Sequence, residues 1–141
     1  MSAVVFVDTS ALYAVLDLDD PRHGEAAQIW QWLLEERRTG AVRCCTHSAV
    51  VTEASALVQR RLGVDALRDL HRATLPLVDV VWIDEELHGR AVAALLAAGR
   101  RDVSLVDWTS FELMRAAAVS SAFAFDAAFA DQGFELLAPT E

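Results

Sequence analysis

Ala3-Val4-Val5-Phe6-Val7-Asp8-Thr9-Ser10 is the stretch that decides the fold. Five apolar residues in a row, with no polar alternation, are typical of a strand covered on both faces, as in the middle of a parallel sheet. Asp8 then stands at the carboxyl end of the strand, where open α/β sheets bind ligands. Asp8 is therefore a candidate site residue. The alternative is that Thr9 or Ser10 caps a helix and Asp8 only adds a favourable charge near the helix start.

Size and composition predict one globular domain over residues 1–141. The chain has 141 residues, of which 54% are apolar, enough for one substantial core and too few for two ordinary domains. Its longest uninterrupted apolar stretch, residues 91–98, is far shorter than the roughly 20 residues that span a bilayer. No basic region precedes an apolar run at the N-terminus. We therefore expect a soluble, cytoplasmic protein.

The charge of the chain limits its chemistry. The formal net charge is −9, and all twelve basic residues are Arg. An acidic surface does not attract nucleic acid in general, so binding of RNA requires local Arg clusters or a bridging cation, and the same surface suits a basic partner. The absence of Lys excludes Schiff-base chemistry and the phosphate-loop Lys. Cys44 and Cys45 are adjacent, which predicts reduced strand residues and not a zinc site.

Strands and helices alternate along the chain, which predicts an α/β sandwich. Strands separated by one or two helices pair in parallel through crossover connections. The predicted strands cover residues 3–7, 41–46, 77–83 and 121–125, with a short edge strand at 134–137. The predicted helices cover residues 11–16, 22–38, 48–62, 65–72, 85–98 and 105–119.

Two carboxylates stand on helices where apolar residues are expected. Helical spacing places Glu53 at the margin of the face that turns toward the sheet, and it places Asp107 on the inner face of its helix. Carboxylates seldom point inward without compensation. For Asp107 the alternative is a capping box with Ser104. For Glu53 the alternative is a buried ion pair with Arg43 or Arg60.

Asp126 ends a predicted strand, as Asp8 does, and parallel pairing would bring both to the same edge of the sheet. Asp84 also ends a strand, but it opens an ordinary acidic first turn and is assigned to capping. If Asp8, Glu53, Asp107 and Asp126 meet, each pair at about 4 Å repels by roughly 1 kcal/mol in water and about 4 kcal/mol at an effective dielectric of 20. A divalent cation resolves this repulsion, and oxygen-only ligands favour Mg²⁺ or Mn²⁺ over zinc.

Four motifs in order resemble the PIN-domain nucleases of the VapC toxin type. These are residues 4–11 with Asp8, residues 51–54 with Glu53, residues 104–111 with Asp107, and residues 124–129 with Asp126, followed by Gly133-Phe134. The resemblance covers essentially the whole chain. It implies a three-layer α/β/α sandwich with a central, mainly parallel sheet of four to five strands.

The resemblance also implies an activity and a set of site residues. The activity is that of a Mg²⁺-dependent endoribonuclease, with Mn²⁺ as a substitute, in a toxin–antitoxin system. Relatives pair with a small VapB-type antitoxin and commonly form homodimers. Many relatives carry another acid directly after the fourth aspartate, where this chain has Ala127 and Ala128, so a second metal site is in doubt. The residues carried over are Asp8 and Asp107 as direct metal ligands, Glu53 and Asp126 as further members of the acidic cluster, Thr9, Ser10 and Ser110 as supporting hydroxyls, and Asp131 as an additional acid.

The expected mechanism is hydrolysis of a phosphodiester by a metal-activated water, with Glu53 or Asp126 orienting the water or taking its proton. Single-stranded or looped RNA suits a crevice at a sheet edge. Candidate phosphate contacts are Arg43, Arg60, Arg61, Arg100 and Arg101.

Three rival interpretations share the strand-end aspartate. A haloacid-dehalogenase-type phosphatase would carry a second aspartate where this chain has Ser10, together with a Lys that is absent. A receiver domain also needs a Lys near its acidic pocket. The third rival is a non-catalytic module whose acidic cluster binds metal or a basic peptide without cutting RNA.

Overall fold

The central sheet is entirely parallel and places Asp8 at its middle. The computed structural model describes residues 2–139, and its strands follow the order β3-β2-β1-β4-β5. Neighbouring strands pair in parallel, with Val5 opposite Cys44 on one side of β1 and opposite Ser121 on the other. The strands are β1 (Ala3–Val7), β2 (Val42–His47), β3 (Asp79–Val81), β4 (Ser121–Phe123) and β5 (Glu135–Leu136).

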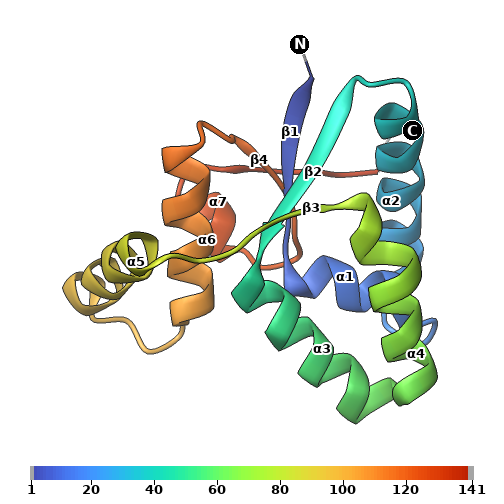
Figure 1. Ribbon diagram of the computed structural model, residues 1–141, viewed down its shortest axis with the longest axis horizontal. Coiled ribbons are helices and arrows are strands. Elements are labelled where there is room, and N and C mark those ends of the chain that lie inside the picture. The colour runs from blue at the N-terminus through green and yellow to red at the C-terminus, as the bar shows by residue number, and fades with distance from the viewer. Residues whose placement is uncertain (1, 140–141) are drawn as a thin grey trace.

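Helices cover both faces of this sheet, which confirms the predicted three-layer sandwich. Figure 1 shows α1 to α4 on one side of the strands and α5 to α7 on the other. The first group consists of α1 (Thr9–Leu16), α2 (His23–Arg38), α3 (Ser48–Leu62) and α4 (Val64–Asp69), with a π-helical turn η1 (Leu70–Thr74) and a 3₁₀ turn η2 (Leu75–Leu77). The second group consists of α5 (Glu85–Ala98), α6 (Leu105–Ala116) and α7 (Ala128–Asp131).

The core is built around β1 and a set of aromatic rings. Phe6 is fully buried, and its ring centroid lies 6.0 Å from that of Phe129. Phe111 on α6 meets Phe129 edge to face at 5.0 Å and Trp108 at 5.4 Å. Such offset and edge-to-face pairs add to the free energy gained from burial of the rings. This packing holds α6 and α7 against the sheet, and with them the acids that these segments carry.

The predicted strand at 3–7 and the predicted helices at 48–62 and 85–98 are confirmed at both ends, and the largest errors in predicted boundaries concern four other elements. The third strand begins only at Asp79, because Leu75–Leu77 forms a 3₁₀ turn that contains Pro76. The predicted helix at 65–72 is α4 followed by η1. α6 stops at Ala116, because Ala118 adopts a left-handed φ of 55°. The fourth strand stops at Phe123, and residues 124–125 lead out of the sheet.

The two cysteines lie in β2 as free thiols, which confirms their predicted role as reduced strand residues. Among residues 2–139, no helix is long and apolar enough to cross a membrane. The carboxyl ends of β1, β2 and β4 meet at one edge of the sheet, and each leads into an acid-bearing segment. This edge carries the candidate site.

Candidate active site

Asp8 is held in a fixed orientation at the end of the central strand. Its side chain is 4% exposed. Its Oδ2 accepts hydrogen bonds from the Ser10 Oγ at 2.7 Å and the Ser10 backbone N–H at 3.2 Å. The Ser10 hydroxyl accepts in turn from the Phe125 N–H at 2.9 Å. Asp8 therefore caps α1 itself, in place of Thr9 or Ser10, and Ser10 links it to the segment that follows β4.

Asp126 lies close to Asp8 in the topology, because β4 pairs with β1. Val7 stands opposite Phe123, and the Asp8 N–H donates to the Phe123 carbonyl at 3.0 Å. Asp126 follows three residues after the end of β4, and its Oδ1 accepts from the Ala128 N–H at 2.9 Å. Parallel pairing therefore brings the ends of both acid-bearing strands to one edge, as the sequence predicts.

Asp107 occupies the first turn of α6 and forms the capping box that was the alternative interpretation. Its Oδ2 accepts from the Ser104 N–H at 3.1 Å, and its own N–H donates to the Ser104 Oγ at 3.1 Å. The side chain is half-buried. Only Oδ2 takes part in the capping box, so capping leaves Oδ1 available to a ligand.

The prediction that Glu53 points inward was wrong. Glu53 is exposed, while Val50, Ala54 and Val58 form the buried face of α3. Successive side chains are 100° apart around the helix axis, so a side chain at the margin of the buried face, such as Glu53, can extend into solvent. The alternative ion pair with Arg43 was wrong as well: Arg43 binds Asp79 at 2.7 Å, and the ion pairs found among residues 2–139 do not include Glu53.

Two of the four carboxylates, Asp8 and Asp107, feel the charges of the other acids. Burial raises the pKa of Asp8 to about 6, against the hydrogen bonds from Ser10 that lower it, and the negative charges of Asp107 and Glu53 raise it further. Burial also raises the pKa of Asp107, with further increases from the charges of Asp126 and Glu53. Desolvation and like charges both disfavour the ionised forms. Full ionisation of the cluster is therefore unfavourable in the chain alone, and the described residues supply no cation in an ion pair with these acids.

The donor set of this cluster fits a hard divalent cation. The ion pairs found within residues 2–139 include none of the four acids, and all four offer carboxylate oxygens, the donors that Mg²⁺ prefers. The carboxylates are not already closed around one point: in the described part of the chain, no three His, Cys, Asp or Glu side chains form a ready-made metal cage. Backbone N–H groups engage Asp8, Asp107 and Asp126 instead.

The other predicted site residues differ in their surroundings. Thr9 is buried next to Asp8, and its Oγ1 has no hydrogen-bond partner among the described residues. Ser110 does not bond to a carboxylate; its partners are His47 and the Val106 carbonyl. Asp131 is exposed on α7. Sequence reasoning missed His47, whose only signal in the sequence is its position at the end of a strand.

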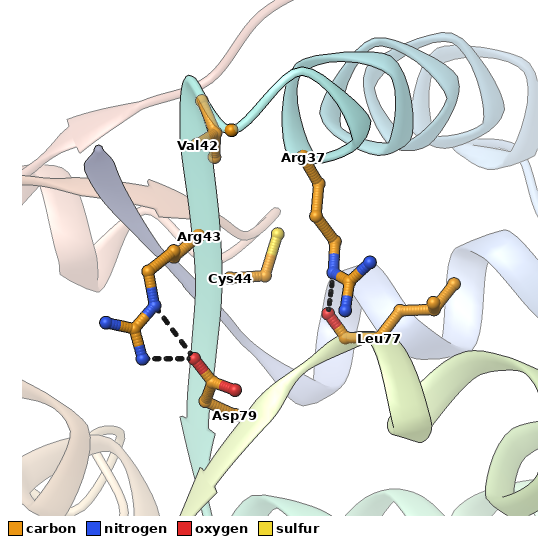
Figure 2. A pocket seen from close by; sticks show the side chains of 7 residues that line it. Arg37, Val42, Arg43, Cys44, Leu77 and Asp79 are labelled. Atoms are coloured by element: carbon orange, nitrogen blue, oxygen red, sulfur yellow. Dashed lines mark hydrogen bonds and ion pairs between the residues drawn. The ribbon is translucent and has the colours of Figure 1, made fainter. Parts of the chain in front are cut away.

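A separate pocket lies at the amino ends of β2 and β3, whereas the acids follow the carboxyl ends of the strands, so this pocket is not part of the site. Figure 2 shows Arg43 bonded to Asp79, and the Arg37 Nε donating to the Leu77 carbonyl at 2.9 Å. Val42 and Asp79 begin their strands, whereas Asp8 follows the end of one. Arg43 is therefore remote from the acids, and its prediction as a phosphate contact is not supported by this position.

Comparison with known proteins gives this arrangement a family. A family model for the PIN domain matches residues 5–135. The chain belongs to the PIN-domain family. This PIN-domain chain is 32% identical over 139 residues to the 23S rRNA-specific endonuclease VapC20 of Mycobacterium tuberculosis, in strains CDC 1551 / Oshkosh and H37Rv. The match covers 96% of this chain and 99% of VapC20.

Solved structures agree with this assignment. The crystal structure of M. tuberculosis VapC20, a sarcin–ricin loop cleaving toxin, matches this PIN domain with a TM-score of 0.83 at 30% identity, over 96% of this chain and 99% of that one. FitAcB from Neisseria gonorrhoeae matches with a TM-score of 0.62 at 15% identity, over 96% and 97% of the two chains, which shows the shared fold alone. The resemblance to VapC-type PIN domains is confirmed.

Replacing the buried carboxylate of Asp8 with an amide should stabilise the metal-free protein. Asp8→Asn keeps the shape and an acceptor for Ser10 but removes the buried charge. In wild type, the raised pKa of Asp8 gives a stabilising contribution that is fully present below pH 3.8 and is lost as pH rises through about 6. In EDTA we expect Asp8→Asn to exceed wild type in unfolding free energy by up to about 3 kcal/mol at pH 7.5. The gain should shrink toward pH 4.

Urea unfolding at several pH values measures this difference. Because the two proteins differ at residue 8 alone, the change of their difference with pH reports on Asp8. An advantage of the variant that does not change between pH 4 and 7.5 would show that burial of the Asp8 charge is not its source.

Proposed function

We propose that this PIN-domain protein is a Mg²⁺-dependent endoribonuclease and the toxin of a toxin–antitoxin pair. The observation that carries the proposal is that parallel pairing of β1 with β4 brings Asp8 and the segment of Asp126 to one edge of the sheet, where the charges of Asp107 and Glu53 also act on Asp8. The similarity to VapC20 over nearly the full length of both chains supports the same activity.

Asp8 and Asp107 are the residues proposed to hold the cation, with Glu53 and Asp126 beside them. When bound, Mg²⁺ would offset the carboxylate charge, lower the pKa of an attacking water and stabilise negative charge on the scissile phosphate. The chain holds the two proposed ligands in fixed orientations: the Ser10 hydroxyl donates to Asp8, and the Ser104 N–H donates to Asp107. Fixed orientation of ligands by hydrogen bonds lowers the cost of binding.

Glu53 is the member of the cluster proposed to orient the water or to take its proton. Asp8, Asp107 and Asp126 each accept a backbone N–H, whereas no hydrogen bond among residues 2–139 engages Glu53. An exposed, unengaged carboxylate next to the reacting phosphate can accept a proton and release it to solvent. The water oxygen bonds to phosphorus as the bond from phosphorus to the 3′-oxygen breaks; Glu53 takes the proton of the water, and the leaving oxygen takes a proton from solvent. The fragments then carry a 3′-hydroxyl and a 5′-phosphate.

A looped RNA strand is the proposed substrate, and a loop of 23S rRNA is its most specific candidate, by similarity to VapC20. The overall charge of −9 opposes duplex binding along a broad surface. Local positive charge lies near the acids, since the Arg22 guanidinium sits 5.3 Å from the Phe125 ring centroid, and Phe125 precedes Asp126. We add Arg22, which also pairs with Glu25 at 3.3 Å, to the proposed phosphate contacts.

Removing one proposed ligand should abolish cleavage. Asp107→Asn keeps the capping geometry but removes the charge, so we expect Mg²⁺-dependent cleavage of 23S rRNA to fall by about 10³-fold or more, a loss of roughly 4 kcal/mol of transition-state stabilisation. The matched control is Asp84→Asn: Asp84 also precedes a helix and caps it, through Leu87 N–H, but belongs to α5. Its activity should stay within about twofold of wild type.

Primer extension and analysis of fragment ends measure the reaction. Cleavage that survives in Asp107→Asn, or that continues in EDTA, would contradict the proposal. A 2′,3′-cyclic phosphate at the fragment ends would contradict attack by water, since that product requires attack by the 2′-hydroxyl. If the purified wild type binds Mg²⁺ but cuts neither ribosomal nor synthetic loop RNA, the non-catalytic module becomes the better interpretation.

Toxicity should depend on the same cluster. Expression of the wild type without its antitoxin should stop bacterial growth, and expression of Asp107→Asn at the same level should not, because cleavage of RNA is the proposed cause of arrest. Growth curves with matched immunoblots measure this. Equal arrest by both proteins would separate toxicity from the acidic cluster.

The proposed partners are a small VapB-type antitoxin and a second copy of this chain. The uncompensated acids favour an antitoxin segment that carries a basic side chain. For the second copy we propose the free edge of β3, where Val81 is 38% and Trp82 is 77% exposed. Two adjoining hollows share Val81 and Leu113 there.

A charge at this edge should separate the two copies. Trp82→Glu places a carboxylate in the proposed apolar contact, so light scattering should show one chain where the wild type shows two. The control is Trp32→Glu, because Trp32 is also partly exposed, at 37%, but lies on α2. A dimer that persists in Trp82→Glu would place the contact elsewhere.

A further inference from the structure

His47 and Thr46 end β2 at the point where three acid-bearing segments meet. Both side chains are fully buried. Buried polar groups are costly unless their hydrogen bonds are satisfied, so the partners of these two residues indicate why polar side chains occupy this position.

The Thr46 hydroxyl connects β2 to the segment that carries Asp8. Its Oγ1 donates to the Val7 carbonyl at 2.8 Å, and Val7 directly precedes Asp8. This bond joins the ends of two neighbouring strands at the edge that carries the acids. His47, the next residue, connects α3 and α6.

The His47 ring makes one hydrogen bond to each of those helices. Its Nδ1 accepts from the Val50 N–H at 3.3 Å and so caps α3, the helix of Glu53. Its Nε2 lies 2.8 Å from the Ser110 Oγ on α6. The Ser110 hydroxyl donates to the Val106 carbonyl at 3.0 Å, one residue before Asp107. Since that hydroxyl proton is used, Nε2–H is the donor and Ser110 the acceptor.

These two hydrogen bonds require the His47 ring to be neutral, with its proton on Nε2. An Nδ1 that accepts and an Nε2 that donates satisfy both ring nitrogens without a charge. The ring also packs against Phe6, with centroids 5.6 Å apart. An apolar residue would fill the same space but would leave the α3 start uncapped and would not connect α3 to α6. His47 is therefore more than filler of the core.

We propose that His47 is a positioning residue, which sets α6 against α3 through Ser110 and thereby fixes where Asp107 and Glu53 stand relative to each other for the proposed cation. The inference rests on the proposed function and deepens it. His47 touches neither the cation nor the substrate. Residues that orient metal ligands from behind typically change metal affinity or activity by 10–100-fold when replaced.

Two substitutions break the connection from opposite ends. His47→Asn keeps a side-chain oxygen that can cap α3, since Asn is among the best capping residues, but its shorter side chain does not reach Ser110. Ser110→Ala removes the acceptor and leaves His47 in place. We expect each to weaken Mg²⁺ binding, measured by calorimetry on the purified protein without RNA, by about tenfold, with a parallel rise in the Mg²⁺ concentration for half-maximal cleavage.

The double variant and two controls separate positioning from general destabilisation. If both substitutions act through one hydrogen bond, the double variant should be no worse than the worse single one. Ser55 and His71 form a serine–histidine bond of the same 2.8 Å length on the surface, so Ser55→Ala and His71→Asn should leave Mg²⁺ affinity unchanged. Leu33→Ala, in the core of α2, should lower the melting temperature without changing Mg²⁺ affinity.

The outcomes distinguish this inference from the function on which it rests. A wild type that binds no Mg²⁺ and cuts no RNA would overturn the proposed function and this inference with it. A wild type that binds and cuts, with Mg²⁺ affinity unchanged in His47→Asn and Ser110→Ala, would overturn this inference alone. Additive losses in the double variant would also overturn it. If His47→Asn does not fold, Ser110→Ala decides the result, because it removes a single buried hydroxyl and leaves the His47 cap of α3 in place.

Discussion

The site depends on a buried carboxylate at the end of the central strand that has other carboxylates around it. The chain alone does not offset the charge of this group with a cation. Asp8 is 4% exposed, and burial together with Asp107 and Glu53 raises its pKa to about 6. Charges in such surroundings normally pair with a cation of the chain or become neutral. The fold instead keeps these charges together, which is typical of sites built for a ligand and costs stability in its absence.

Helix starts make this arrangement tolerable. Asp8 caps α1, Asp107 lies in the first turn of α6, and Asp126 accepts the N–H at the start of α7. The positive end of a helix and its free N–H groups partly offset a negative charge. Capping and ligand binding, which are competing explanations for an acid in the sequence, are therefore compatible in the structure. Each of these three acids uses one oxygen to hold its helix, and its other oxygen takes no part in that bond.

Much of this was predictable because it depends on local patterns. The unbroken apolar run before Asp8 predicted a central strand, and the alternation of strands and helices predicted the parallel sandwich. The Ser104 and Asp107 capping box and the cap at Asp84 were readable from spacing. Glu53 was not: its helical position lies at the margin of the buried face, where a few degrees of rotation decide whether a carboxylate points inward or outward. The short β3 depended on Pro76, whose 3₁₀ turn delays the strand.

The sequence by itself determined which residues are acidic, which elements carry them and in what order, since these follow from composition and periodicity. Only the tertiary structure decided that the charges of these elements reach one another, and that His47 connects α3 to α6 through Ser110. The physical reason is that strand pairing and helix packing join residues separated by tens of positions, and no local pattern encodes such contacts. A buried histidine with both nitrogens satisfied is therefore visible only in the folded chain.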